Sequence, residues 1–388
     1  MYRIQVMNRI SPAGLGALPP SEFSCGTDLT DPHAILVRSA DLHELEFTDN
    51  LACIARAGAG TNNIPIDRCS EEGIVVFNTP GANANAVKEL VLCSLFLASR
   101  DIAGGVRWAE SLKGKGAEVP ALVEKGKSNF SGPELEGKSL GIIGLGAIGV
   151  MVANAAHHLG MEVYGHDPYI SVDAAWGLSR WVRKSDGLKT LLEKSDYITL
   201  HTPVTPETKH MLDASAFALM KPGVRLVNLA RGELVSTPDL LSALRSGVVA
   251  RYICDFPSDE LLGEPNVVSI PHLGASTPES ETNCATMAVR QMVDYLKNGN
   301  IKNAVNLPDV QSAREGAARI CAIHRNIPEM VSRISNIVSS EHINIANMAN
   351  RAKNTYAYTL IDIDSDIGPD VVRRMSELEG VLRVRVLR

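Results

Sequence analysis

The sequence predicts an α/β protein with two doubly wound, Rossmann-like parallel-sheet domains and a small ferredoxin-like domain at its end. Three observations predict this fold class. Short apolar runs alternate with helical segments as far as residue 300, which is typical of parallel sheets. A glycine-rich turn directly follows one of these runs. From residue 318 the expected order of elements changes to βαββαβ, and the 388 residues suit two or three domains.

The first domain is predicted from four apolar runs that turn signals or short helical stretches separate. Val87, Val91 and Leu95 recur at helical spacing and predict a long helix. This helix covers residues 84–99. The predicted strands span residues 2–7, 34–38, 51–57 and 74–78.

A second α/β series starts at Ser139, after a polar stretch over 112–137 that is rich in Gly and Lys. Six strands with intervening helices are typical of a dinucleotide-binding domain. One more helix, over 277–298, ends at the sequence Asn-Gly-Asn. The predicted strands span residues 139–143, 162–166, 197–201, 225–229, 250–254 and 267–270.

The tail reads as a separate small domain behind a polar linker. A domain of this size often acts by pairing with a second copy, which would bury its apolar face. Its predicted strands span 319–324, 344–350, 356–362 and 382–386, and its helices 328–340 and 369–379. The expected domains are therefore 1–96 with 284–308, then 97–283, the linker 309–317, and 318–388.

Composition excludes several classes of protein. A net charge of −6 argues against nucleic acid as the main partner. No apolar run reaches the length of a membrane span, and the N-terminus does not resemble a signal peptide. The seven cysteines are scattered without a C-x-x-C pair, so we expect reduced thiols in the cytoplasm and no metal site.

A dinucleotide-binding motif occurs between a predicted strand and a predicted helix, the context that it requires. Gly144 allows the tight turn, Gly146 lets a pyrophosphate approach the backbone, and Gly149 lets the helix pack close to the strand. The helix N-terminus offers unpaired N–H groups to the phosphate. The motif reads Gly144-Leu145-Gly146-Ala147-Ile148-Gly149.

An acidic residue at the end of the next strand indicates which cofactor binds. Asp167 lies 18 residues after Gly149, where a carboxylate can accept hydrogen bonds from the ribose hydroxyls of the adenosine. The same carboxylate would repel a 2′-phosphate. The sequence therefore favours NAD over NADP.

Four polar residues follow the later strands of this second series. Ligands of open α/β sheets bind at the carboxyl ends of strands, so these residues can reach the nicotinamide. A histidine can take a hydroxyl proton, a carboxylate can orient it, and an arginine can bind a substrate carboxylate through two hydrogen bonds. The four residues are Arg231, Asp255, Glu260 and His272.

Four motifs resemble, in the same order, those of the D-isomer-specific 2-hydroxyacid dehydrogenases. The resemblance runs from about residue 30 to 308, and the tail resembles an ACT domain, a module that senses small molecules in many members. One departure is that Phe256 directly follows Asp255, where the family has Asp-Val-Phe. The motifs are Gly-Leu-Gly-Ala-Ile-Gly from residue 144, Asn-Leu-Ala-Arg-Gly from 228, Asp-Phe-Pro-Ser-Asp-Glu from 255 and Pro-His-Leu-Gly-Ala-Ser-Thr from 271.

The resemblance implies a role for each polar residue. Arg231 would bind the substrate carboxylate, His272 would be the acid and base, and Glu260 would be the partner of that histidine. Asp255 would contact the nicotinamide amide. Glu264 remains a rival for the role of Glu260, because a proline follows Glu264 and none follows Glu260.

The resemblance also implies which further residues bind cofactor and substrate. The lysines of 112–127 are candidates for a substrate phosphate, with a solvated flexible loop as the alternative. The implied substrate residues of the first domain are Arg56, Ala57, Gly58 and Asn83. The implied cofactor residues are Gly144, Gly146, Ala147, Ile148, Gly149, Asp167, Thr202, Pro203, Ala230, Asp255 and Gly274.

Within the family, the likeness is greatest to members that oxidise 3-phospho-D-glycerate with NAD, the first step of L-serine biosynthesis. A glyoxylate or hydroxypyruvate reductase and a non-catalytic, NAD-sensing corepressor remain alternatives. A homodimer or homotetramer is expected.

L-Serine is a candidate effector of the tail. The positions that match effector residues of serine-sensitive relatives are His324, Asn326 and Asn344. Glu329 and His342 occupy positions that relatives usually fill with glycine, and a carboxylate there would oppose serine binding.

Overall fold

The computed structural model describes residues 1–388 and forms two compact units. Unit 1 contains residues 1–83 and 278–388, and unit 2 contains residues 84–277. We call residues 1–83 with 278–308 the first domain, residues 84–277 the second domain and residues 318–388 the tail. None of the helices combines the length and apolar character needed to cross a membrane.

The first domain is a five-stranded parallel sheet in the order β2-β1-β3-β4-β5. Alternate residues of β3 face opposite sides: Leu36 packs with helix α11, and Ile35 packs with helix α2. The sequence missed β2, whose four residues include only one that is buried, Phe23. The elements are β1 Tyr2–Met7, α1 Pro12–Leu15, β2 Phe23–Gly26, β3 Ala34–Val37, β4 Cys53–Arg56, α2 Ile66–Glu71, β5 Val75–Phe77 and α11 Pro278–Asn298.

The second domain is a seven-stranded parallel sheet in the order β12-β11-β10-β9-β6-β7-β8. Apolar clusters cover both of its faces, and the predicted doubly wound fold is confirmed. Only the two-residue edge strand β8 was not predicted. The elements are β6 Ser139–Ile143, α6 Ala147–His158, β7 Glu162–His166, α7 Val172–Gly177, β8 Arg183–Lys184, α8 Leu188–Lys194, β9 Tyr197–Leu200, α9 Ala214–Phe217, β10 Val224–Asn228, η3 Gly232–Leu234, α10 Thr237–Arg245, β11 Val249–Cys254, η4 Asp259–Leu261 and β12 Val267–Ser269.

Helix α3 (Ala84–Ser99) belongs to the second domain. Its apolar side chains Val87, Val91 and Leu95 are buried in the same cluster as Leu140 of β6. The sequence placed the domain boundaries after residues 96 and 283, whereas the units divide after residues 83 and 277. The packing of the apolar face of α3 decides this division.

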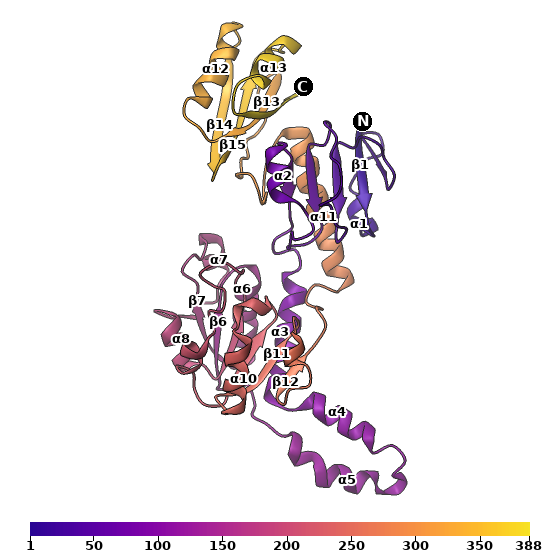
Figure 1. The fold of residues 1–388 in the computed structure, drawn as a ribbon, viewed down its shortest axis with the longest axis vertical. Coiled ribbons are helices and arrows are strands. Elements are labelled where there is room, and N and C mark those ends of the chain that lie inside the picture. Colours follow the sequence, from indigo (N-terminus) through magenta and orange to yellow (C-terminus); the bar gives the residue numbers. More distant parts are fainter. The chain divides into compact units, whose positions relative to one another are not determined.

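The polar stretch before β6 is a helical hairpin rather than a flexible loop. Its helices are α4 Ile102–Ser111, η1 Gly116–Glu118, α5 Val119–Gly126 and η2 Lys127–Phe130. The Trp108 ring lies 5.3 Å from that of Phe130 and also packs against Gly126. These contacts hold the two arms of the hairpin together, and Figure 1 shows the hairpin projecting away from the sheet.

The tail is a four-stranded antiparallel sheet in the order β14-β15-β13-β16, so the predicted ferredoxin-like order is confirmed. Two helices pack on one face through Ile334 of α12, Met375 of α13 and Ile320 of β13. The elements are β13 Ala318–Arg325, α12 Met330–Ser340, β14 Ile345–Lys353, β15 Tyr356–Ile363, α13 Pro369–Ser376 and β16 Val381–Leu387.

The other face of the tail sheet packs on the first domain. Cys321, Ile323 and Tyr358 belong to one apolar cluster with Tyr295 of α11. This apolar face of the tail sheet is therefore covered within the chain itself, and the pairing of two tails stays a prediction.

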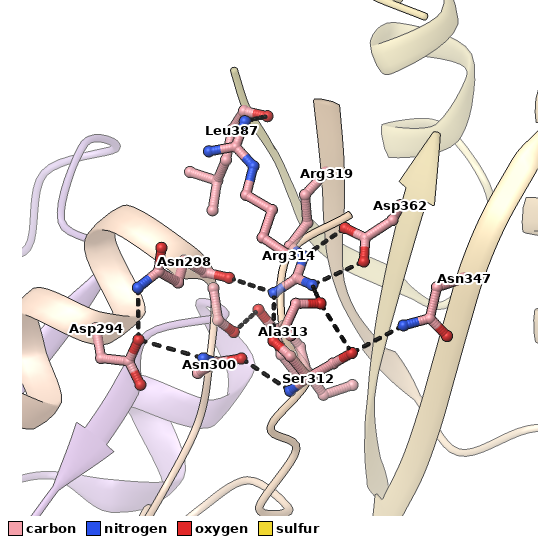
Figure 2. A network of polar contacts seen from close by, with 12 residues as sticks. Asp294, Asn298, Asn300, Ser312, Ala313, Arg314, Arg319, Asn347, Asp362 and Leu387 are labelled. Carbon is pink, nitrogen blue, oxygen red and sulfur yellow. Dashed lines mark hydrogen bonds and ion pairs between the residues drawn. The ribbon is translucent and has the colours of Figure 1, made fainter. Parts of the chain in front are cut away.

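A buried arginine joins the tail to the segment before it. Arg319 has no exposed surface, and its guanidinium pairs with the carboxylate of Asp362 at 2.6 and 2.7 Å. It also donates to the carbonyls of Asn298, Ser312 and Ala313 at 2.8–3.1 Å (Figure 2). The predicted linker is thus an ordered segment that helps to satisfy a buried charge.

Candidate active site

The glycine-rich turn between β6 and α6 has the shape that a dinucleotide requires. Gly144 has φ of 93°, and a Cβ there would lie 2.7 Å from the carbonyl oxygen of His201. A Cβ on Gly149 would clash with the carbonyl oxygen of Gly144. A Cβ on Gly146 would meet no atom within 4 Å, so the missing side chain leaves open space. That space is where a pyrophosphate approaches the backbone.

Two further groups fit the cofactor at this turn. Ala147 and Ile148 open α6, so their N–H groups belong to the first turn and have no partner within the helix. Asp167 at the end of β7 accepts from the backbone N–H of Leu145 and of Tyr169, both at 2.8 Å. These bonds hold the carboxylate beside the turn, where it can accept from ribose hydroxyls. The turn thus combines an open space above Gly146 with a nearby carboxylate acceptor, the combination that the sequence predicts for an NAD site.

Asn228, whose role was not predicted, shapes the loop that follows β10. Its buried side-chain amide donates to the carbonyl of Arg231 at 2.8 Å and accepts from the N–H of Ala230 at 3.2 Å. Its amide nitrogen also lies 3.2 Å from the hydroxyl of Tyr252. The sequence signal was the motif Asn-Leu-Ala-Arg-Gly, in which only the arginine received a role.

Asp255 is a buried carboxylate at the end of β11. Its side chain is 2% exposed, and neither of its oxygens has a hydrogen-bond partner. Burial raises the pKa of Asp255 to about 6, although the positive charge of Arg231 acts in the opposite direction. A Cβ on Gly274 would lie 3.6 Å from this carboxylate. A buried acceptor without a donor suits a ligand amide, as expected of the nicotinamide contact.

Phe256 lies between the two residues expected to act on the substrate. Its ring centre is 4.3 Å from the His272 ring and 5.3 Å from the guanidinium carbon of Arg231. Sequence reasoning gave Phe256 no role, although the shortened Asp-Phe run was the signal that could have found it. The structure therefore brings Arg231 and His272 together at one aromatic ring, directly after Asp255 in the sequence.

The two glutamates considered as partners of His272 differ in their surroundings. Glu260 is exposed in η4, and its pKa is lowered, first by the Ser258 hydroxyl and then by the backbone. Glu264 forms an ion pair with Arg245 at 3.0 Å. Because Glu264 is already paired with Arg245, Glu260 is favoured as the partner of His272.

The remaining candidates of the second domain lie in the loop after β9 and on the hairpin before β6. Thr202 and Pro203 follow β9 after one intervening residue, His201, at the same end of the sheet as the glycine turn. The lysines of 112–127 lie on the helical hairpin, which leads away from these strand ends (Figure 1). Lys127 forms an ion pair with Glu124 there.

The substrate candidates of the first domain lie at the end of β4 and beyond β5. Arg56 donates to the side chain of Asn63 at 3.3 Å, and its guanidinium covers Gly58 so closely that a Cβ at 58 would clash with it. Ala57 is buried between them, and Asn83 is the last residue before the second domain. The glycine at 58 therefore lets the arginine fold back over its own loop.

The effector candidates of the tail differ in exposure. His324 is 2% exposed, and its ring nitrogens lie 2.8 Å from the carbonyl of Arg325 and 2.8 Å from the hydroxyl of Thr359. Burial lowers the pKa of His324. Asn326 and Asn344 are exposed. Of the three effector candidates, only Asn326 and Asn344 have side chains that are accessible to solvent.

Comparison with known proteins agrees with this geometry. The family model for the NAD-binding domain of D-isomer specific 2-hydroxyacid dehydrogenases matches residues 96–274. D-3-Phosphoglycerate dehydrogenase of Escherichia coli K12 is 33% identical over 96% of this chain and 90% of that protein. D-3-Phosphoglycerate dehydrogenase 1 of Saccharomyces cerevisiae is 31% identical over 92% of this chain and 79% of that protein.

A solved structure shows the same architecture. The NAD+-bound 3-phosphoglycerate dehydrogenase of Entamoeba histolytica superposes with a TM-score of 0.62 at 26% identity, over 79% of this chain and 98% of that chain. The predicted family and cofactor are confirmed. The chain is an NAD-dependent dehydrogenase of the D-isomer-specific 2-hydroxyacid dehydrogenase family.

Proposed function

We propose that this chain oxidises 3-phospho-D-glycerate at C2 to 3-phosphooxypyruvate, the first step of L-serine biosynthesis. The observation that carries this proposal is the extent of the likeness to proteins named D-3-phosphoglycerate dehydrogenase. The Escherichia coli protein matches 96% of this chain, so the likeness extends over both units. It goes well beyond the NAD-binding domain at 96–274 that defines the family.

His272 is proposed as the base that takes the proton of the C2 hydroxyl. Histidine has the ordinary pKa nearest to neutrality and can release the proton again. Glu260, with its lowered pKa, stays ionised and stabilises the protonated imidazole. Bound NAD supplies the nicotinamide ring that accepts the hydride. The Phe256 ring against His272 limits the orientations of the imidazole.

Arg231 is proposed as the binder of the substrate carboxylate. One of its nitrogens, Nη1, donates to the carbonyl of Ala230 at 2.6 Å, and this bond orients the planar guanidinium group. The other N–H groups of the guanidinium can donate two parallel hydrogen bonds to a carboxylate. The positive charge of the guanidinium also stabilises the negative charge on the C2 oxygen as the carbonyl forms.

The first domain is proposed to supply the remaining substrate contacts through Arg56, Ala57, Gly58 and Asn83. The backbone N–H of Thr79 donates to the carbonyl of Gly58 at 3.1 Å. The amide of Asn78 donates to the carbonyl of Ala59 at 2.6 Å. These bonds tie the loop after β4 to the loop after β5, and so support a preformed binding surface.

The proposal is tested by following NADH formation with a panel of D-2-hydroxy acids. We expect the highest kcat/KM for 3-phospho-D-glycerate, and little activity with D-lactate or glycerate. A reverse assay with glyoxylate, hydroxypyruvate and 3-phosphooxypyruvate completes the panel. A preference for an unphosphorylated acid in either direction overturns the proposed substrate and leaves the family assignment intact.

L-Serine is proposed as an effector that binds at Asn326 and Asn344. His324 would act by positioning, since its imidazole is held within the tail. The test compares inhibition by L-serine in the wild type and in Asn344→Ala, with Asn336→Ala, an exposed asparagine of α12, as the matched control. We expect loss of inhibition in Asn344→Ala alone. Equal activity of all three proteins at millimolar serine contradicts the proposal.

We further propose a homo-oligomer in the cytoplasm. All seven cysteines are free thiols, which supports a reducing compartment. Light scattering of the purified protein distinguishes a dimer or tetramer from a monomer.

A further inference from the structure

A polar cavity of about 360 Å³ lies where the tail meets the first domain. One wall is strand β16 of the tail, and the other consists of the start of β1, the segments that precede β3 and β4, and the end of α11. The polar side chains in its lining are Tyr2, His33, Asp49, Asn50, Arg383 and Arg385. The mechanism proposed above uses none of them.

The alternation of β16 places two arginines on the same side of the tail sheet. Val384 and Val386 pack into the apolar core beneath the tail helices, while Leu387 belongs to the cluster of the first domain. Arg383 and Arg385 share the face of Leu387, because side chains two residues apart point the same way. Their Cα atoms are therefore about 7 Å apart.

Neither arginine pairs with a carboxylate. Arg383 donates to the carbonyls of Leu51 and, at 3.2 Å, of Glu72. Arg385 donates to the carbonyl of Leu296 at 3.0 Å and lies 4.6 Å above the Tyr295 ring. Two half-buried positive charges thus face one cavity, and their direct contacts are carbonyl oxygens and a ring face rather than a carboxylate.

The wall of the first domain adds a neutral donor. The Nδ1 atom of His33 accepts from the backbone N–H of Arg3 at 3.0 Å, so in the neutral ring the proton lies on Nε2. Burial and the charge of Arg3 lower the pKa of His33, which keeps the ring neutral at pH 7. Arg3 pairs with Asp31 at 2.7 Å. The acidic residue in the lining of the cavity is Asp49, which is exposed.

We propose that this cavity binds a compact oxyanion, the carboxylate or phosphate group of a small metabolite. Two guanidinium forks match such a group bidentately, and the imidazole of His33 supplies a further N–H donor. The two arginines outweigh the one acid at the rim, so the cavity favours an anion. Because the ligand touches both the tail and the first domain, it strengthens their association and stabilises the folded chain.

The test uses the full chain with sodium malonate and sodium phosphate as probes. Sodium chloride at equal ionic strength is the reference. We expect a saturable rise in Tm with malonate, phosphate or both, and the more effective probe shows which oxyanion the cavity prefers. Arg383→Gln and Arg385→Gln should each weaken binding by at least about tenfold. Arg388→Gln, which alters an exposed arginine just beyond the same strand, should bind like the wild type.

Hydrogen exchange of the wild type covers the case in which the arginine variants fail to fold. Either probe should slow amide exchange in β16 and in residues 49–52, and sodium chloride should not. Equal Tm shifts with chloride overturn the proposal, as do wild-type affinities in Arg383→Gln and Arg385→Gln. An absence of protection in both segments also overturns it.

Discussion

The second domain and the tail both contain a sheet that is buried on its two faces, but different parts of the chain bury them. In the second domain every residue of β6 and β9 is buried, and helices of the same domain cover both faces. In the tail, β13 and β15 are almost as fully buried. The tail helices cover one face, and the first domain covers the other.

This difference shows that local sequence does not determine whether a domain buries its own core. The second domain completes its own core, so its site lies where its strands and glycine motif place it. The tail completes its core only by packing on the first domain. It is therefore an integral part of unit 1 rather than a free module behind a linker.

The largest effect is expected at the proton-transfer residue of the second domain. His272→Ala should lower kcat by about 10²–10⁴-fold, the usual contribution of a general acid or base. Because His272 is exposed, Tm and NAD affinity should stay close to those of the wild type. The measurement is NADH formation at saturating substrate, and near-normal turnover contradicts the assigned role.

In the tail, the largest effect is expected from the buried ion pair. Arg319→Met leaves the Asp362 carboxylate buried without its partner, which should cost about 3–5 kcal/mol of stability. Faster amide exchange in β13 and β15 would report this loss. The double variant Arg319→Met/Asp362→Leu should recover most of it, because it removes both charges. Wild-type exchange rates in the single variant would show that the tail is held by its apolar face alone.

A smaller effect is expected from the buried carboxylate of the second domain. Burial raises the pKa of Asp255 from 3.8 to about 6, so the folded state holds the proton more tightly than the unfolded chain. The free energy of unfolding should therefore fall as pH rises from about 4 to about 6, and stay lowered above that range. Asp255→Asn removes this dependence and should be more stable at pH 7 by up to about 3 kcal/mol.

The measurement for Asp255→Asn is urea unfolding at several pH values in the absence of NAD. The difference between variant and wild type isolates this carboxylate from the other titrating groups. A difference that does not change between pH 4 and pH 6 contradicts the raised pKa.

The smallest effect is expected from backbone strain in the tail. Glu329 precedes α12 with φ of 65°, a left-handed conformation that costs a residue with a side chain about 1–2 kcal/mol. Glu329→Gly should stabilise the tail by up to about 1 kcal/mol, since the added flexibility of the unfolded chain offsets part of the gain. Glu329→Ala is the control that keeps the strain and removes the charge. An equal Tm for both variants would assign the effect to charge.

Most elements of the structure were predictable because their signals are local. The apolar runs of the strands and the helical spacing in α3 depend only on neighbouring residues. The missed strands β2 and β8 lack a buried apolar run, since only Phe23 of β2 is buried and both residues of β8 are exposed. The glycine turn was predicted because three backbone positions each require a missing side chain. Asn228 and Phe256 were not, because their roles depend on contacts with residues distant in the sequence.

The sequence by itself determined the fold class, the order of helices and strands along the chain, and the cofactor turn. Periodicity and backbone sterics act between near neighbours, so these features can be predicted locally. Only the tertiary structure decided what each apolar face contacts. It placed α3 with the second domain, packed the tail on the first domain, and set Arg383 and Arg385 around a shared cavity. The physical reason is that burial is not directional: an apolar face specifies that it must be covered, and the shape of the folded chain specifies by what.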